Sequence, residues 1–190
     1  MKPAIIVVDM LKDNLKPEYP ISAQIRSILP AVQRLLKMGR ARGYPIIFAC
    51  DSYLPEDFIF QGKMKPHAIQ GTRGAEVIAE LSPAPEDLVL PKRRFSAFFQ
   101  TGLEKTLETQ GVDVLVLAGV ATHVCVLMTA MDGICHDFRV IVLEDCCASY
   151  RPEIHRWTVK TYERSPIEPL LRFMTLEGFL SLLEASAVEE

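Results

Sequence analysis

The chain has 190 residues, of which 49% are hydrophobic and 24% are charged, and its formal net charge is -3. This length supports one domain with a full core and is short for two, so we expect a single domain over residues 1–190. Charges of both signs are interspersed, which argues against nucleic acid or a membrane surface as a partner. The five cysteines include no zinc-type pair with two residues between them, and this usage predicts a protein of the reducing cytoplasm.

Short apolar runs rich in Val, Ile and Leu alternate along the chain with segments of helical period. The runs predict strands over residues 4–8, 45–50, 88–90, 114–118 and 139–143, with a further short one around Phe173. The segments between them predict helices over residues 21–42, 75–81, 101–110, 123–134, 152–164 and 175–183. This alternation predicts an α/β fold, a three-layer α/β/α domain with a mostly parallel sheet of about six strands and helices on both faces.

The stretch from Val112 to Cys135 holds the first candidate for chemistry. Its apolar strand is broken by Gly119, and Thr122 is then expected to cap the helix that follows. Cys125 falls in the first turn of that helix, where the positive end of the helix dipole favours a thiolate. This position predicts a nucleophile, and the alternative is that Cys125 is a small buried apolar residue.

Asp9 and Lys92 also lie at the carboxyl ends of predicted parallel strands. Those ends share one edge of an open α/β sheet, so both side chains are expected to meet Cys125 in one crevice. Asp9 is suited to take the thiol proton and return it to a leaving amine, while Lys92 stabilises negative charge. Taken singly, Asp9 also fits a strand-end cap or a metal ligand, and Lys92 fits a surface lysine beside Arg93 and Arg94.

Four stretches of the sequence form a recognisable set: AIIVVDM at 4–10, QGTRGAEV at 70–77, KRRFSAFFQTGL at 92–103 and LVLAGVATHVCV at 115–126. With these stretches the chain resembles the isochorismatase-like cysteine hydrolases, a superfamily that includes nicotinamidases and N-carbamoylsarcosine amidohydrolase. The resemblance extends from residue 4 to about residue 148. It implies that Asp9 is the general base and acid, Lys92 the electrostatic partner and Cys125 the nucleophile.

The same resemblance implies a cis peptide between Val120 and Ala121, with the N–H groups of Ala121 and Cys125 forming an oxyanion hole. The implied reaction cleaves a C–N bond of a small amide, ureide or nicotinamide-like substrate through a thioester. Two alternatives stay open. One is an isochorismatase-type vinyl ether hydrolase, and the other is a catalytically idle interaction module on the same fold. The resemblance also implies a homo-oligomer.

Nicotinamidases in this superfamily carry an Asp-x-His pair and a further His, which bind a metal. Here Asp51 and His67 match the first and last of these positions, but Tyr53 stands at the middle one. A phenol loses its proton only near pH 10, and two remaining ligands fall short of the three expected for catalytic zinc. We therefore expect no cofactor and no tightly held metal, with Asp51 and His67 as the ligands if zinc does bind.

The remaining candidates concern the walls of the crevice. The connection over residues 52–74 is long for a compact domain, and such connections are usually functional. From it, His67 is expected to contact the substrate or pack on the crevice. Phe98 and Phe99 are candidate substrate contacts because they follow Lys92 closely, although aromatic side chains are more often part of the core. His123 lies two residues before Cys125, so we expect it to face away from the nucleophile.

Overall fold

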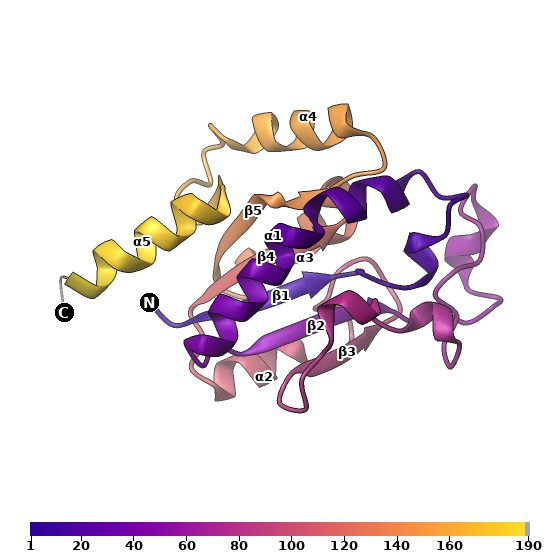
Figure 1. The fold of residues 1–190 in the computed structure, drawn as a ribbon, viewed down its shortest axis with the longest axis horizontal. Helices are drawn as coiled ribbons and strands as arrows, with labels where there is room; N and C mark the ends of the chain where they lie inside the picture. The colour runs from indigo at the N-terminus through magenta and orange to yellow at the C-terminus, as the bar shows by residue number, and fades with distance from the viewer. Residues whose placement is uncertain (189–190) are drawn as a thin grey trace.

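The computed structural model describes residues 1–188, with side-chain environments up to residue 185. Six strands form one sheet, and all of them are parallel to their neighbours (Figure 1). The strands are β1 (Pro3–Val8), β2 (Ile46–Asp51), β3 (Leu88–Lys92), β4 (Val114–Val120), β5 (Arg139–Ala148) and β6 (Leu171–Met174). The α-helices are α1 (Ile21–Ala41), α2 (Leu103–Thr109), α3 (Leu127–Cys135), α4 (Pro152–Tyr162) and α5 (Leu176–Val188).

The order of strands across the sheet is β3-β2-β1-β4-β5-β6. The chain therefore builds outward from β1 to β3 on one side and then returns to place β4 on the other side of β1. A reversal of this kind leaves a crevice at the carboxyl ends of the two strands that flank it. In this sheet the flanking strands are β1 and β4, so the residues that follow Val8 and Val120 lie beside that crevice.

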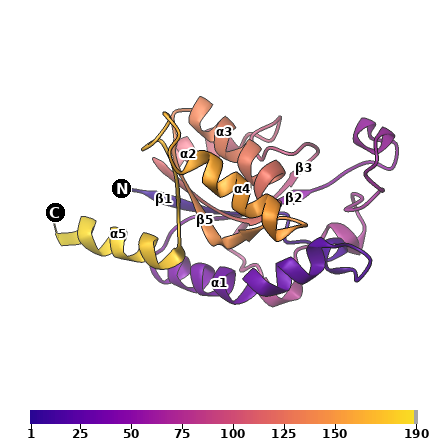
Figure 2. The same cartoon turned by 90° about the horizontal axis from the view of Figure 1, so that it is seen from above.

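The helices cover both faces of the sheet. α1 and α5 lie on one face, and α2, α3 and α4 lie on the other (Figure 2). Successive residues of β1 are buried in alternate layers. Ile5 and Val7 pack in the layer beneath α1, while Ala4, Ile6 and Val8 pack in the layer beneath α2 and α3. The three-layer α/β/α architecture expected from the sequence is confirmed.

Two predicted elements away from the crevice differ from the structure. Residues 75–81 form no α-helix, because Val77 makes an antiparallel bridge with Leu11 between two short 3-10 turns, Arg73–Ala75 and Ala79–Leu81. The strand expected to end at Leu143 continues to Ala148, because β5 resumes pairing with β4 after an irregularity in the register.

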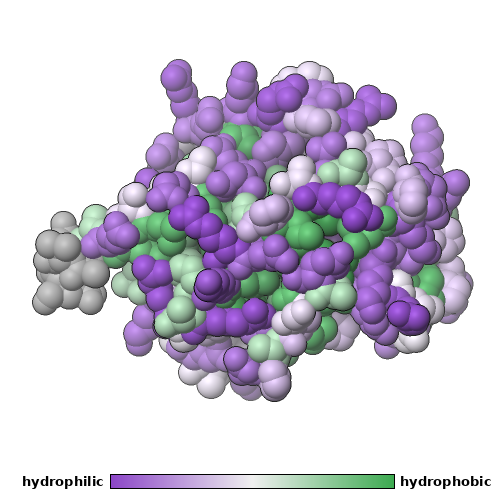
Figure 3. Space-filling model, viewed as in Figure 1, coloured by the Kyte–Doolittle hydropathy of each residue, from purple (hydrophilic) through white to green (hydrophobic). Residues whose placement is uncertain are grey.

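The molecular surface in the view of Figure 3 is largely hydrophilic, with hydrophobic side chains showing between the charged ones. Among residues 1–188, none of the helices combines the length and the apolar character needed to cross a membrane.

Candidate active site

Asp9 is the first residue after β1 and is almost fully buried at the crevice. Its backbone has a φ of 51°, a left-handed conformation that aspartate tolerates better than most residues. The conformation is held from both sides, because the Asp9 N–H donates to the Ala49 carbonyl at 2.9 Å and the Asn14 amide donates to the Asp9 carbonyl at 2.9 Å. The carboxylate is thereby fixed relative to the sheet.

Lys92 reaches the same point from β3, two strands away. Its ammonium group is 2.9 Å from one carboxylate oxygen of Asp9 and also pairs with the Asp51 carboxylate. The other oxygen of Asp9 accepts a hydrogen bond from the Asp51 N–H at 2.8 Å. All three side chains are buried, so one cation stabilises two carboxylates out of contact with water. The sequence indicated a role for Asp51 only as a metal ligand and missed this ion pair.

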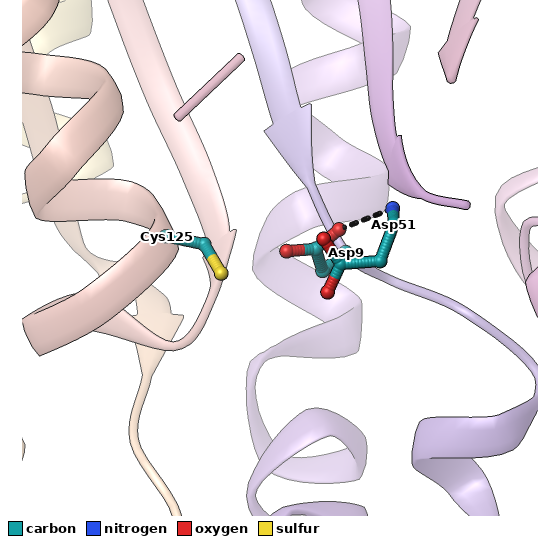
Figure 4. Close-up of side chains that lie close together, drawn as sticks. All are labelled: Asp9, Asp51 and Cys125. Carbon is teal, nitrogen blue, oxygen red and sulfur yellow. Dashed lines mark hydrogen bonds between the residues drawn. The ribbon is translucent and has the colours of Figure 1, made fainter. Parts of the chain in front are cut away.

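Cys125 follows β4 on the other side of the crevice, and its sulfur faces Asp9 (Figure 4). One ligand-type atom from each of Asp9, Asp51 and Cys125 lies within 4.8 Å of the other two. Gly119 permits this approach of β4 to β1, because its φ is 110° and a Cβ there would lie 2.1 Å from the Val8 carbonyl oxygen. The expected cis peptide between Val120 and Ala121 is present.

The turn that carries Cys125 differs from the expected helix start. Residues Thr122–Val126 form a π-helical turn, and α3 begins only at Leu127. Thr122 makes no cap, because its hydroxyl lies 2.9 Å from Nδ1 of His155 instead. Cys125 thus sits on a wider turn that precedes the α-helix.

Burial determines the charge states at this site. Burial, followed by the neighbouring Asp51 carboxylate, raises the pKa of Asp9 to about 6 despite the opposing effect of Lys92. Burial also raises the pKa of Cys125 well above its usual range, and Lys92 offsets only part of this effect. For Lys92, burial acts to lower the pKa, but Asp9, Cys125 and Asp51 outweigh it, so the pKa is raised. Burial therefore acts against the thiolate form that the position of Cys125 favours, and Lys92 acts for it.

A cavity of about 600 Å³ opens over these groups. Its floor includes Asp9, Asp51 and Cys125, together with Ala121 at the end of β4. Its walls come mainly from the loops after β1 and β2 and from the segments after β3 and β5. The wall residues are Asn14, Tyr19, Pro20, Ile21, Tyr53, Lys63, Met64, His67, Phe95, Val120, Val124 and Tyr150. The volume is suited to a small molecule.

The aromatic residues after Lys92 are placed differently from the prediction. Phe95 lines the cavity, whereas Phe98 is buried against His136 with their ring centroids 5.1 Å apart. Phe99 is half exposed and lines a separate hollow beside Arg93 and Arg94. Phe98 and Phe99 therefore lie outside the cavity wall as the structure describes it. Their order in the sequence placed them near Lys92, but the turns over residues 95–102 decide which ring faces the crevice.

The two histidines considered from the sequence are placed as expected. His67 lines the cavity, with its ring centroid 5.6 Å from that of Tyr53. His123 faces away, because its Nδ1 lies 2.9 Å from the Ser149 hydroxyl and its ring packs on Tyr150. The sequence did not identify Asn14, Tyr19, Lys63 or Tyr150 as wall residues. Of these four, only Tyr150 could have been predicted from the sequence, because it follows a strand whose carboxyl end lies at the edge of the sheet that holds the crevice.

The donor groups do not fit a catalytic zinc ion. Asp51 is already paired with the Lys92 ammonium. Burial raises the pKa of Tyr53 above its usual range, so its phenol stays protonated and is a poor ligand. Nδ1 of His67 lies 2.9 Å from the Lys65 carbonyl, which leaves Nε2 as the available donor. The alternative group of Asp9, Asp51 and Cys125 has suitable atoms, but the Lys92 ammonium already occupies the cationic position between its two carboxylates.

Comparisons of the sequence with known proteins identify relatives of this chain. Over 165 residues the chain is 35% identical to a probable inactive nicotinamidase from Arabidopsis thaliana, covering 80% of this chain and 83% of that protein. Over 163 residues it is 29% identical to the maleamate amidohydrolase of Pseudomonas putida, covering 81% of this chain and 76% of that protein.

Solved structures agree. An isochorismatase-like hydrolase from Alkaliphilus metalliredigens superposes with a TM-score of 0.85 at 29% identity, covering 96% of this chain and all of that one. The pyrazinamidase of Pyrococcus horikoshii in complex with zinc superposes with a TM-score of 0.79 at 25% identity, covering 93% of this chain and 100% of that one. The model of the isochorismatase domain family matches residues 3–171, and the chain therefore belongs to the isochorismatase family of hydrolases.

Proposed function

We propose that this protein is a cysteine hydrolase that cleaves a C–N bond of a small amide, ureide or nicotinamide-like substrate. One observation carries the proposal: Asp9, Lys92 and Cys125 meet, buried, at the edge of a cavity sized for a small molecule. A base, a cation and a thiol in one crevice are the groups that acyl transfer to sulfur requires. Maleamate amidohydrolase, a relative by sequence, is named for this class of reaction.

In the proposed reaction Asp9 takes the proton of Cys125 as the sulfur attacks the substrate carbonyl carbon. Negative charge passes to the carbonyl oxygen, where the N–H groups of Ala121 and Cys125 form the oxyanion hole. The C–N bond then breaks, and Asp9 returns its proton to the leaving amine. Water attacks the resulting thioester with Asp9 again acting as base, so the acid is released and the thiol is restored.

The raised pKa of Cys125 makes the base essential in this scheme. A thiol that stays protonated in the resting site reacts only when its proton is removed during attack. Asp9 is suited to this because its pKa of about 6 makes it a stronger base than an ordinary aspartate while leaving it mostly ionised at neutral pH. Lys92 keeps Asp9 ionised, and Asp51 holds the Lys92 ammonium in place.

We further propose that no metal takes part in the reaction, because the Lys92 ammonium already supplies the positive charge between the carboxylates. The sequence-based expectations of self-association and of a cytoplasmic location stay predictions.

The substrate class is tested by measuring ammonia release from nicotinamide, maleamate and N-carbamoyl amino acids, with and without EDTA. We expect release from at least one of these compounds, and an unchanged rate after chelation because no step uses a metal. A rate that collapses in EDTA and returns with zinc would contradict the metal-free scheme. Release from none of the compounds would favour vinyl ether cleavage, tested next with isochorismate, or an idle module of the kind that the name of the Arabidopsis relative describes.

The pH dependence gives an independent test of Asp9 as the base. Because its pKa is about 6, kcat/KM is expected to fall about tenfold for each unit of pH below that value. The sign follows from the chemistry, since an Asp9 carboxyl that is already protonated is too weak a base to take the thiol proton. The profile is measured from pH 4.5 to 8, with circular dichroism confirming that the protein stays folded. A profile that stays flat between pH 5 and 8 rules out Asp9 as a base with this pKa.

A further inference from the structure

Tyr53 has a feature that the scheme above does not use. Its side chain is fully buried, and its hydroxyl oxygen has no hydrogen-bond partner among the described residues. A buried hydroxyl without a partner lowers stability, because it has lost its hydrogen bonds to water without replacing them. Native proteins keep few such groups, and those that persist call for an explanation.

The surroundings of Tyr53 hold it rigidly at the cavity. Its backbone N–H donates to the Ala68 carbonyl at 3.0 Å, and its carbonyl accepts from the Gln70 N–H at 2.8 Å. Its ring packs edge-on against Phe60 and His67, with ring centroids 5.3 and 5.6 Å away. The ring is thus fixed by backbone and aromatic contacts that do not involve the hydroxyl.

The hydroxyl keeps a proton to donate, because a phenol ionises only near pH 10. Tyr53 lines the same cavity as Asp9, Asp51 and Cys125. The two carboxylates in this group are already bonded to the Lys92 ammonium and, for Asp9, to the Asp51 N–H. No described residue accepts a hydrogen bond from this O–H, and Tyr53 lines the cavity, so a molecule bound there can supply the acceptor.

We propose that Tyr53 determines specificity by donating its O–H to a hydrogen-bond acceptor on the substrate, close to the scissile carbonyl. This inference rests on the proposed function and narrows its substrate class. The enzyme selects amides or ureides that carry a second acceptor, such as a ring nitrogen, a ureide carbonyl or a carboxylate, over simple amides. Sites that hydrogen-bond a substrate in this way discriminate strongly against analogues that lack the partner atom.

Binding is the direct test, because it does not require turnover. In a Cys125→Ala background, calorimetry gives the Kd of nicotinamide against benzamide, and of maleamate against cis-crotonamide. Each pair differs in one acceptor group, a neutral ring nitrogen in the first and a carboxylate in the second. We expect the acceptor-bearing member of one pair to bind about 10- to 100-fold more tightly, and Tyr53→Phe to abolish that difference without weakening the binding of its analogue. The pair that responds identifies the acceptor as neutral or anionic.

Thermal unfolding separates recognition from a structural role. Tyr53→Phe removes a hydroxyl that has no internal partner, so its Tm is expected to stay unchanged or rise. Tyr44→Phe is the matched control, since Tyr44 lines a different hollow and is expected to leave all four Kd values unchanged.

Three results would overturn the proposal: equal weakening of both members of a pair in Tyr53→Phe, binding of none of the four compounds, or a Tm clearly below that of Tyr44→Phe. Failure of the proposed function is distinguishable from these. It would appear as Tyr53-dependent binding together with no ammonia release by the enzyme that retains Cys125.

Discussion

Replacing Cys125 with alanine is expected to lower kcat/KM for the best amide substrate by on the order of 10⁴-fold or more. Cys125 is the one cysteine among the described residues that line the cavity, so its loss leaves only binding and the oxyanion hole. Acid-quenched wild-type reactions, digested and analysed by mass spectrometry, are expected to show the acyl group on the peptide that carries Cys125.

Cys50→Ala is the matched control, because Cys50 is also buried at the end of a strand near Asp9. Burial raises the pKa of Cys50 to about 12, and its thiol donates to the Phe48 carbonyl, so we expect nearly full activity from this variant. Activity of Cys125→Ala within tenfold of wild type would contradict the thioester. It would mean that water attacks the substrate directly, as the vinyl ether alternative allows.

Replacing Lys92 with methionine is expected to lower the free energy of unfolding by about 3–5 kcal/mol at pH 8, because Asp9 and Asp51 then share a buried space without a cation. The loss is expected to shrink as the pH falls. Without Lys92 the folded-state pKa of Asp9 rises further above the unfolded value, so the folded chain binds protons more readily and gains stability on acidification. Urea titrations at pH 8, 6.5 and 5 measure the trend.

Activity is expected to fall in the same variant, because Asp9 becomes protonated in the range where it must act as a base. A double variant that adds Asp51→Asn removes one of the two unpaired carboxylates, and we expect it to recover part of the stability. Lys12→Met serves as control, since the pair of Lys12 with Glu76 is exposed and contributes little. A stability loss that is independent of pH would argue against the charge network and for a packing defect.

The sequence predicted the sheet and its functional edge because both depend on local patterns. Runs such as that from Ala4 to Val8 are apolar without alternation, and only strands buried on both faces tolerate this. The polar residues that end those runs, Asp9 and Lys92, are then brought to one edge by the parallel topology. Knowing that a residue lies at the carboxyl end of a parallel strand is sufficient to place it at that edge.

The remaining features depend on tertiary contacts that no local pattern records. Phe95 rather than Phe98 lines the cavity because of the turns over residues 95–102, which no local pattern predicts. The raised pKa of Cys125 follows from its burial, which outweighs the positive charge of Lys92. The ion pair between Asp51 and Lys92 requires knowing that β2 and β3 are neighbours in the sheet.

The ion pair also has a consequence for strand alignment. Asp51 and Lys92 are direct partners in the ladder of β2 and β3, and Val8, just before Asp9, is the partner of Ala49. A slip of one residue in either ladder would turn a charged side chain to the opposite face of the sheet and leave it among apolar residues. The buried charges of the site therefore favour a single register of β1, β2 and β3. A molecule with wrongly paired strands would be both unstable and inactive.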